Sequence, residues 1–141
     1  LHEVTHRFLQ SDFPEIPSWF DEGFAALHEK SSFKNGNLAG EFSWRIISIR
    51  RAFENNNYTN LRVLMETNDE ELYGQRSSYY YAQARYLLMM LQQKGLLKDY
   101  YTLFKETYSK DETGITQLEK VTKKPLADID EELVEFIKSF N

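Results

Sequence analysis

The sequence has no cysteine in its 141 residues, which excludes disulfide bonds and thiolate metal ligands. A bound metal ion would therefore have to use nitrogen and oxygen donors. No stretch approaches the roughly 18 consecutive apolar residues that a membrane-spanning helix needs. Segments that alternate apolar and polar residues are scarce, and neither internal repeats nor low-complexity regions occur.

The net charge is −5 at pH 7, which argues against a general nucleic-acid-binding role. The basic clusters at 45–51 and 120–124 are expected to be solvated helix faces. Hydrophobic residues make up 41% of the chain and aromatic residues 15%, enough to supply a core. At this length we expect one domain, residues 1–141.

Apolar residues recur at helical spacing along most of the chain. The patterns predict helices over about 19–30, 41–54, 78–94, 96–108, 113–121 and 126–140, with short pieces at 61–66 and 68–72. Ser77 or Ser78 is expected to cap the helix that ends near Lys94, and Gly95 is expected to close it. The predicted fold class is all-α, a helical bundle.

The first residues contain the pattern His-Glu-x-x-His, as His2-Glu3-Val4-Thr5-His6. Two histidines four apart lie on one face of a helix, so both rings can reach one ion. Glu3 beside them can act as general base toward a water that the metal activates. Chance would give this pattern in roughly one such chain in a few hundred. The sequence has only three histidines, and the pattern therefore favours a zinc site.

A catalytic zinc ion usually takes three protein ligands, so a third ligand is needed. Pro14 and Pro17 cannot continue the first helix, and Ser18 is expected to cap a second helix with Asp21 in a capping-box arrangement. Glu22, in the first turns of that helix, is the preferred third ligand, and Asp21 is the second choice. The nearby acidic candidates are Asp12, Glu15, Asp21, Glu22 and Glu29.

Gly23 follows the preferred ligand inside the predicted helix, where glycine costs roughly 1 kcal/mol relative to alanine. A glycine at this position indicates the close approach of another backbone, either the first helix or a substrate.

The first motif followed by Pro17-Ser18-Trp19-Phe20-Asp21-Glu22-Gly23-Phe24-Ala25 resembles the gluzincins, zinc metallopeptidases of the MA clan, and especially the bacterial peptidase-MA-like domains. The stretches 81–88, 91–97 and 122–129 extend the resemblance over nearly the whole chain. It implies His2, His6 and Glu22 as Zn²⁺ ligands and Glu3 as the catalytic base. It also implies that the bundle is the zinc-binding and C-terminal part of a thermolysin-like (zincin) catalytic domain.

The chain departs from the family pattern in two ways. Thermolysin-like relatives carry an aspartate four residues after the ligand glutamate, which orients a zinc histidine; here that residue is Ala26, so the support must come from elsewhere. The clan's N-terminal sheet, which precedes the first motif, is absent from this chain. We therefore expect a piece of a longer protein, with any signal peptide upstream; the resemblance suggests an extracytoplasmic location.

Peptide hydrolysis also needs a group that stabilises the oxyanion, and related peptidases often use a tyrosine or histidine from a later helix. Tyr79, Tyr80 and Tyr81 are candidates, and we prefer Tyr81 because it heads a stretch that resembles the family, with Tyr80 next. All three could instead be packing residues. Gln83 and Arg85 could contact a substrate or lie on a helix surface.

The sequence thus predicts a zinc metallopeptidase with a peptide or protein substrate and no nucleic-acid partner. His28 lies about 9 Å along the helix from Glu22 and is expected to be a solvated or packing residue. One alternative function is a non-catalytic helical interaction module that retains a relic zinc site. Another is zinc-dependent hydrolysis of a non-peptide bond. The oligomeric state is not predicted.

Overall fold

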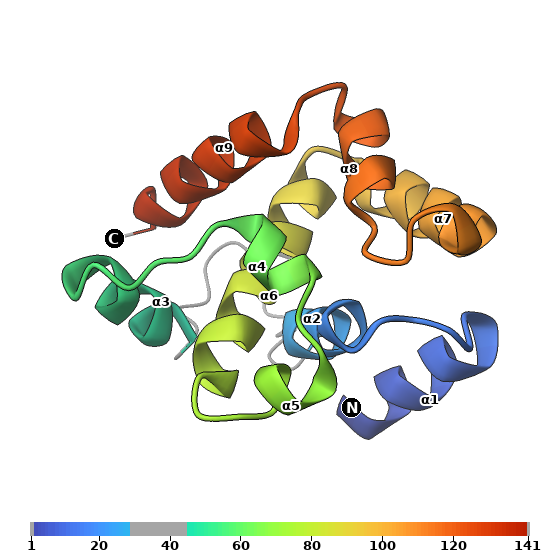
Figure 1. Cartoon of the computed structure of the whole chain (residues 1–141), viewed down its shortest axis with the longest axis horizontal. Helices are drawn as coiled ribbons and strands as arrows, with labels where there is room; N and C mark the ends of the chain where they lie inside the picture. Colours follow the sequence, from blue (N-terminus) through green and yellow to red (C-terminus); the bar gives the residue numbers. More distant parts are fainter. Residues whose placement is uncertain (1, 29–44, 141) are drawn as a thin grey trace, which may run out of the picture.

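The computed structural model describes residues 2–28 and 45–140, and at His2 the backbone alone. Every regular element in these two ranges is a helix, so the predicted all-α class is confirmed there (Figure 1). The elements are α1 (His2–Asp12), α2 (Ser18–His28), α3 (Arg45–Glu54), α4 (Leu61–Met65), α5 (Asp69–Leu72), α6 (Ser77–Gln93), α7 (Leu97–Thr107), the 3-10 turn η3 (Tyr108–Lys110), α8 (Ile115–Thr122) and α9 (Leu126–Lys138). No helix within the described ranges is long and apolar enough to cross a membrane.

Helix α6 is the central element of the bundle. Its residues from Tyr79 to Leu91 are buried on all sides except at Tyr81, the pattern of a helix enclosed by others. It packs against α2, α3, α4, α5, α7 and α9, and Figure 1 shows it crossing the middle of the molecule. Elements far apart in the sequence are therefore held in place by one shared helix.

The two ends of α6 test the predicted start and stop signals. The helix begins at Ser77 after Arg76, and no side chain caps it, so the predicted serine cap is wrong. The predicted stop is confirmed, because Gly95 directly after the C-cap residue Lys94 has a φ of 72°. Glycine adopts this left-handed conformation without steric cost.

The end of α1 is attached to α7. Phe13, which is fully buried, packs edge-on against the rings of Phe104 and Tyr108 at 5.5 and 5.7 Å between centroids. On the surface above it, Asp12 accepts hydrogen bonds from Tyr101 at 2.6 Å and Lys105 at 3.1 Å. These contacts fix the turn that follows, and α2 then packs against α1.

Helix α2 lies unusually close to α6 at Gly23. A Cβ atom added there would lie 3.0 Å from Leu88 Cδ1 and 3.1 Å from Ala84 Cβ. The predicted close approach at this glycine is therefore real. The partner is α6, whereas the prediction named the first helix or a substrate. The contact sets how deeply the neighbouring Glu22 sits in the molecule.

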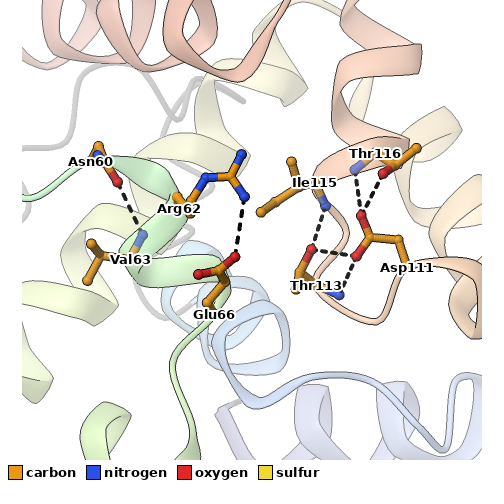
Figure 2. A network of polar contacts seen from close by, with 8 residues as sticks. All are labelled: Asn60, Arg62, Val63, Glu66, Asp111, Thr113, Ile115 and Thr116. Atoms are coloured by element: carbon orange, nitrogen blue, oxygen red, sulfur yellow. Dashed lines mark hydrogen bonds and ion pairs between the residues drawn. The ribbon is translucent and has the colours of Figure 1, made fainter.

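The short helices α4 and α5 both begin at an asparagine. Asn60 accepts a hydrogen bond from Val63 N at 3.3 Å (Figure 2). Asn68 and Glu71 form a complete capping box, in which each side chain accepts from the other residue's backbone N–H. Such caps supply partners for backbone donors that a helix start leaves unsatisfied. They define the turn that places Tyr73 directly after α5.

The turn before helix α8 contains a carboxylate that accepts four hydrogen bonds (Figure 2). The two oxygens of Asp111 accept from the backbone N–H and hydroxyl groups of Thr113 and Thr116, at 2.6 to 3.0 Å. Burial by itself would raise the pKa of Asp111, but these hydrogen bonds outweigh it and lower the pKa to about 2. The carboxylate thus stabilises the start of the helix in its ionised form.

Candidate metal centre

The candidate centre lies where His6 of α1 faces the first turns of α2. His6 Nδ1 is 2.7 Å from Asp21 Oδ1, and its Nε2 is 3.3 Å from Glu22 Oε1. Both carboxylates are buried, with 6% of Asp21 and 7% of Glu22 exposed. Since burial of a charged group is costly unless it is paired, the two acidic side chains are held here by specific partners.

The spacing of two of these atoms fits a zinc ion. Zn–N distances near 2.0–2.1 Å and Zn–O distances near 2.0–2.2 Å place two donors of a tetrahedral site roughly 3.3–3.5 Å apart. His6 Nε2 and Glu22 Oε1 are 3.3 Å apart. An imidazole nitrogen and a carboxylate oxygen are also donors that zinc accepts, so this pair is compatible with two ligands of one ion.

The remaining residues of the motif are described less completely. His2 lies in α1 one turn before His6, but its side chain is outside the described part of the chain. Among the side chains that are described, no group of three potential metal ligands occurs. Glu3 is exposed in the first turn of α1, a position accessible to solvent.

Asp21 does not have the predicted capping role. Helix α2 begins at Ser18, and the carbonyl of Pro17 accepts hydrogen bonds from the backbone of Phe20 and Asp21. The Ser18 hydroxyl donates to Asp69 Oδ1 at 2.6 Å, which links the start of α2 to α5. The Asp21 carboxylate is therefore available to His6. Asp21 contacts Nδ1 of His6 while Glu22 faces Nε2, so the two carboxylates lie at opposite nitrogens of the ring.

Asp21 also supplies support that Ala26 cannot give. Ala26 is fully buried and has no polar side-chain atom, whereas Asp21 accepts from His6 through one oxygen. The other oxygen of Asp21 accepts from Gln10 Nε2 at 3.3 Å. The carboxylate thus joins α2 to two positions of α1. Asp21 is therefore a candidate for the support that the sequence predicts from elsewhere in the chain.

Tyr73 is a site residue that the sequence did not reveal. Its hydroxyl donates to Glu22 Oε2 at 2.8 Å across 51 residues of sequence. Burial, and then the hydrogen bond to Glu22, raise the pKa of Tyr73, so the hydroxyl stays protonated at neutral pH. The capping box at Asn68 predicts a turn nearby, but no pattern connects that turn to the motif.

The three consecutive tyrosines have different surroundings. Tyr79 is buried, and its hydroxyl accepts from the Thr59 backbone N–H at 2.8 Å and donates to the Thr59 carbonyl at 3.2 Å, a structural role. Tyr80 is also buried and packs beside Tyr79. Tyr81 is half-buried, with its ring edge-on to Tyr73 at 6.4 Å. Because Tyr73 donates to Glu22, this contact places Tyr81 beside the candidate centre. Burial, and then the charge of Glu22, raise the pKa of Tyr81 to about 12.

Two polar residues of α6 are structural. Gln83 is fully buried and donates to the Thr59 carbonyl at 2.8 Å. Arg85 is 3% exposed and donates to the Ala26 carbonyl. The predicted alternatives, a substrate contact or a helix surface, are therefore both wrong for these residues. Their hydrogen bonds attach α6 to its neighbours.

Two further basic residues were assigned from the sequence. Arg45, predicted to be solvated, is instead buried and lies 5.3 Å from the ring centroid of Tyr81. His28 stacks on Phe24 at 6.5 Å between ring centroids, which confirms a packing role. Burial, and then the charge of Arg85, lower the pKa of His28, so this ring is neutral at pH 7.

A separate apolar groove of about 740 Å³ lies between α1, α2 and α7. Val4 and Phe8 of α1 line it and are 63% and 66% exposed. Since successive helical residues are about 100° apart, these two side chains point roughly opposite to His6. The groove is therefore distinct from the candidate centre.

Comparisons of the chain with protein-family models, curated proteins and solved structures gave no significant match.

Proposed function

We propose that this protein is a zinc-dependent metallopeptidase of the gluzincin type, which hydrolyses peptide bonds with Glu3 as general base. The observation that carries the proposal is the convergence of His6 Nε2 and Glu22 Oε1 at 3.3 Å. The sequence places these residues on different helices, and the resemblance to gluzincins implies that both bind one zinc ion. The packing of α1 on α2 brings them together.

The proposed ligands of the zinc ion are His2, His6 and Glu22. Two neutral imidazoles and one carboxylate leave a net charge of +1 on the site, which favours an ionised water and a developing oxyanion. When bound, zinc supplies Lewis-acid activation of the attacking water and of the scissile carbonyl.

Glu3 carries the proton transfers. Its carboxylate takes a proton from the attacking water as the new C–O bond forms at the scissile carbonyl carbon. It then gives this proton to the amine nitrogen as the C–N bond breaks. Its exposed position in α1 is consistent with a base that must reach both water and substrate.

Tyr81 is the proposed donor to the carbonyl oxygen as negative charge develops there. Its hydroxyl is protonated at neutral pH, as in any tyrosine, and burial and the charge of Glu22 raise its pKa further, to about 12. Its half-buried position beside Tyr73 leaves part of the side chain exposed to a substrate.

Substitution of the proposed base tests the function directly. Glu3→Gln in the protein as the cell makes it should retain zinc and lower peptidase kcat by about 10²-fold or more, because the proton acceptor is lost. Glu15→Gln, at an exposed position between α1 and α2, is the matched control and should keep full activity. Glu22→Ala should lower zinc occupancy, measured by metal analysis after dialysis.

Three results would contradict the proposal. Unchanged turnover in Glu3→Gln removes the assigned base. Unchanged zinc stoichiometry in Glu22→Ala removes the third ligand. A wild-type protein that holds zinc but cleaves no peptide favours the non-catalytic interaction module instead.

A further inference from the structure

His6 and Glu22 face each other across the candidate centre. Each also makes a hydrogen bond to another polar side chain through the atom that points away from the centre. His6 is held at Nδ1 by Asp21 at 2.7 Å, and Glu22 at Oε2 by Tyr73 at 2.8 Å. The opposite atom of each side chain, Nε2 in one case and Oε1 in the other, faces the centre. The same arrangement thus occurs twice, from different elements.

The contact with Asp21 requires a proton on Nδ1 of His6. An ionised carboxylate can only accept, so Nδ1 must donate to it. In a neutral ring, Nε2 then has a lone pair directed at the centre. Asp21 is itself held by the 3.3 Å hydrogen bond from Gln10, which limits its movement away from the ring.

The contact with Tyr73 divides the two oxygens of Glu22. Oε2 accepts the phenol hydrogen bond, while Oε1 lies 3.3 Å from His6 Nε2. A carboxylate held in this way offers one oxygen to a metal ion. The phenol comes from the end of α5, whose position is fixed to α2 by the hydrogen bond from Ser18 to Asp69.

From this geometry we infer that Asp21 and Tyr73 are positioning residues for the zinc ligands: Asp21 holds His6 as the Nδ1–H tautomer, and Tyr73 restricts Glu22 to coordination through one oxygen. The inference rests on the proposed zinc function. It goes beyond it by assigning roles to two residues that do not bind the metal. Groups of this kind typically change metal affinity by roughly 10–100-fold.

The first experiment measures the zinc dissociation constant by competition with a chelator. Asp21→Ala and Tyr73→Phe should each weaken zinc binding by about 10-fold or more. Asp21→Asn retains an acceptor oxygen and should recover part of the loss. The matched control for Tyr73→Phe is Tyr101→Phe, which removes another tyrosine–carboxylate hydrogen bond, to Asp12 at the far end of α1; its zinc affinity should equal that of the wild type.

A second measurement separates positioning from simple loss of folding. The ¹⁵N chemical shifts of the metal-free protein report the tautomer of His6. Wild type and Asp21→Asn should show Nδ1 protonated, whereas Asp21→Ala should show a mixture of tautomers or mainly Nε2–H. Circular dichroism identifies any variant that has lost its helices.

The outcomes distinguish this inference from the proposed function. Wild-type zinc affinity in Asp21→Ala and Tyr73→Phe, or an unchanged His6 tautomer in Asp21→Ala, overturns the inference and leaves the proposed function intact. A wild-type protein that binds zinc, with the expected losses in the variants but no peptidase activity, overturns only the proposed function. No zinc binding by the wild type overturns both.

Discussion

At the scale of single residues, the partner of a polar side chain decides its role. Asp21 is at a position where an acidic residue often caps a helix, yet its carboxylate accepts from His6 and Gln10. Asp111 is a loop residue whose carboxylate organises the start of α8. Sequence identifies both as acidic residues near helix starts, but only the structure shows that Asp21 contacts side chains of α1 whereas Asp111 accepts from the start of α8.

Asp111 gives the fold a defined sensitivity to acid. Its pKa is about 2 in the folded protein and near 3.8 in an unfolded chain. A lowered folded-state pKa gives stability that is present above pH 4 and is lost as the pH falls from about 4 to 2. Asp111→Asn should lower the free energy of unfolding by about 1 kcal/mol at pH 7, a value discounted for solvent screening.

Urea unfolding at pH 7 and at pH 2.5 tests this prediction. The difference between wild type and Asp111→Asn should shrink at the lower pH, because the wild-type carboxylate loses part of its charge. Glu106→Gln, at an exposed position of α7, is the control and should match the wild type at both values. A difference that stays constant with pH would contradict the assignment.

At the scale of secondary structure, the sequence predicts where helices lie better than it predicts the structural role of each glycine. Gly95 and Gly114 both have positive φ, 72° and 82°. Gly95 ends α6 and was predicted from its place after an apolar helix. Gly114 precedes α8, and no local pattern revealed that it lies against Phe104 and Tyr100 of α7.

These two glycines form a matched pair of substitutions. In Gly114→Ala the new Cβ would lie 2.5 Å from both Phe104 Cε2 and Tyr100 OH. The overlap and the left-handed backbone, which is unfavourable for alanine, should together lower the free energy of unfolding by about 3 kcal/mol. In Gly95→Ala no atom of the described residues lies within 4 Å, so the loss should be only about 1 kcal/mol.

Chemical denaturation of both variants measures these losses. Equal losses would show that backbone conformation alone matters at Gly114 and that α7 adjusts to the added methyl group. A loss confined to Gly114→Ala would show that Gly95 is not constrained to its left-handed conformation.

At the scale of the whole molecule, the candidate centre combines elements that meet only in the folded bundle. His6 belongs to α1, Glu22 to α2 and Tyr81 to α6, while Tyr73 follows α5. Helix α6 contacts both α2 and α5, so the same packing that forms the core assembles the centre. Zinc that binds to this arrangement should therefore stabilise the folded state as a whole.

Zinc at about 100 times its dissociation constant should add about 2.7 kcal/mol to the free energy of unfolding. Thermal denaturation with and without zinc measures the effect as an increase in Tm. His6→Ala should lose this increase, whereas His28→Gln should retain it, because His28 packs on Phe24. The same increase in His6→Ala and wild type would mean that zinc stabilises the protein at some other place.

The sequence by itself determined the helical class, most helix positions and the proposed ligands, because helical periodicity and the spacing of His2 and His6 are local properties of the chain. Tertiary structure decided which side chains meet. It paired Asp21 with His6, joined Tyr73 to Glu22 over 51 residues, and buried Gln83 and Arg85. Such contacts depend on how helices pack against α6, and no local pattern records the neighbour that a side chain will have.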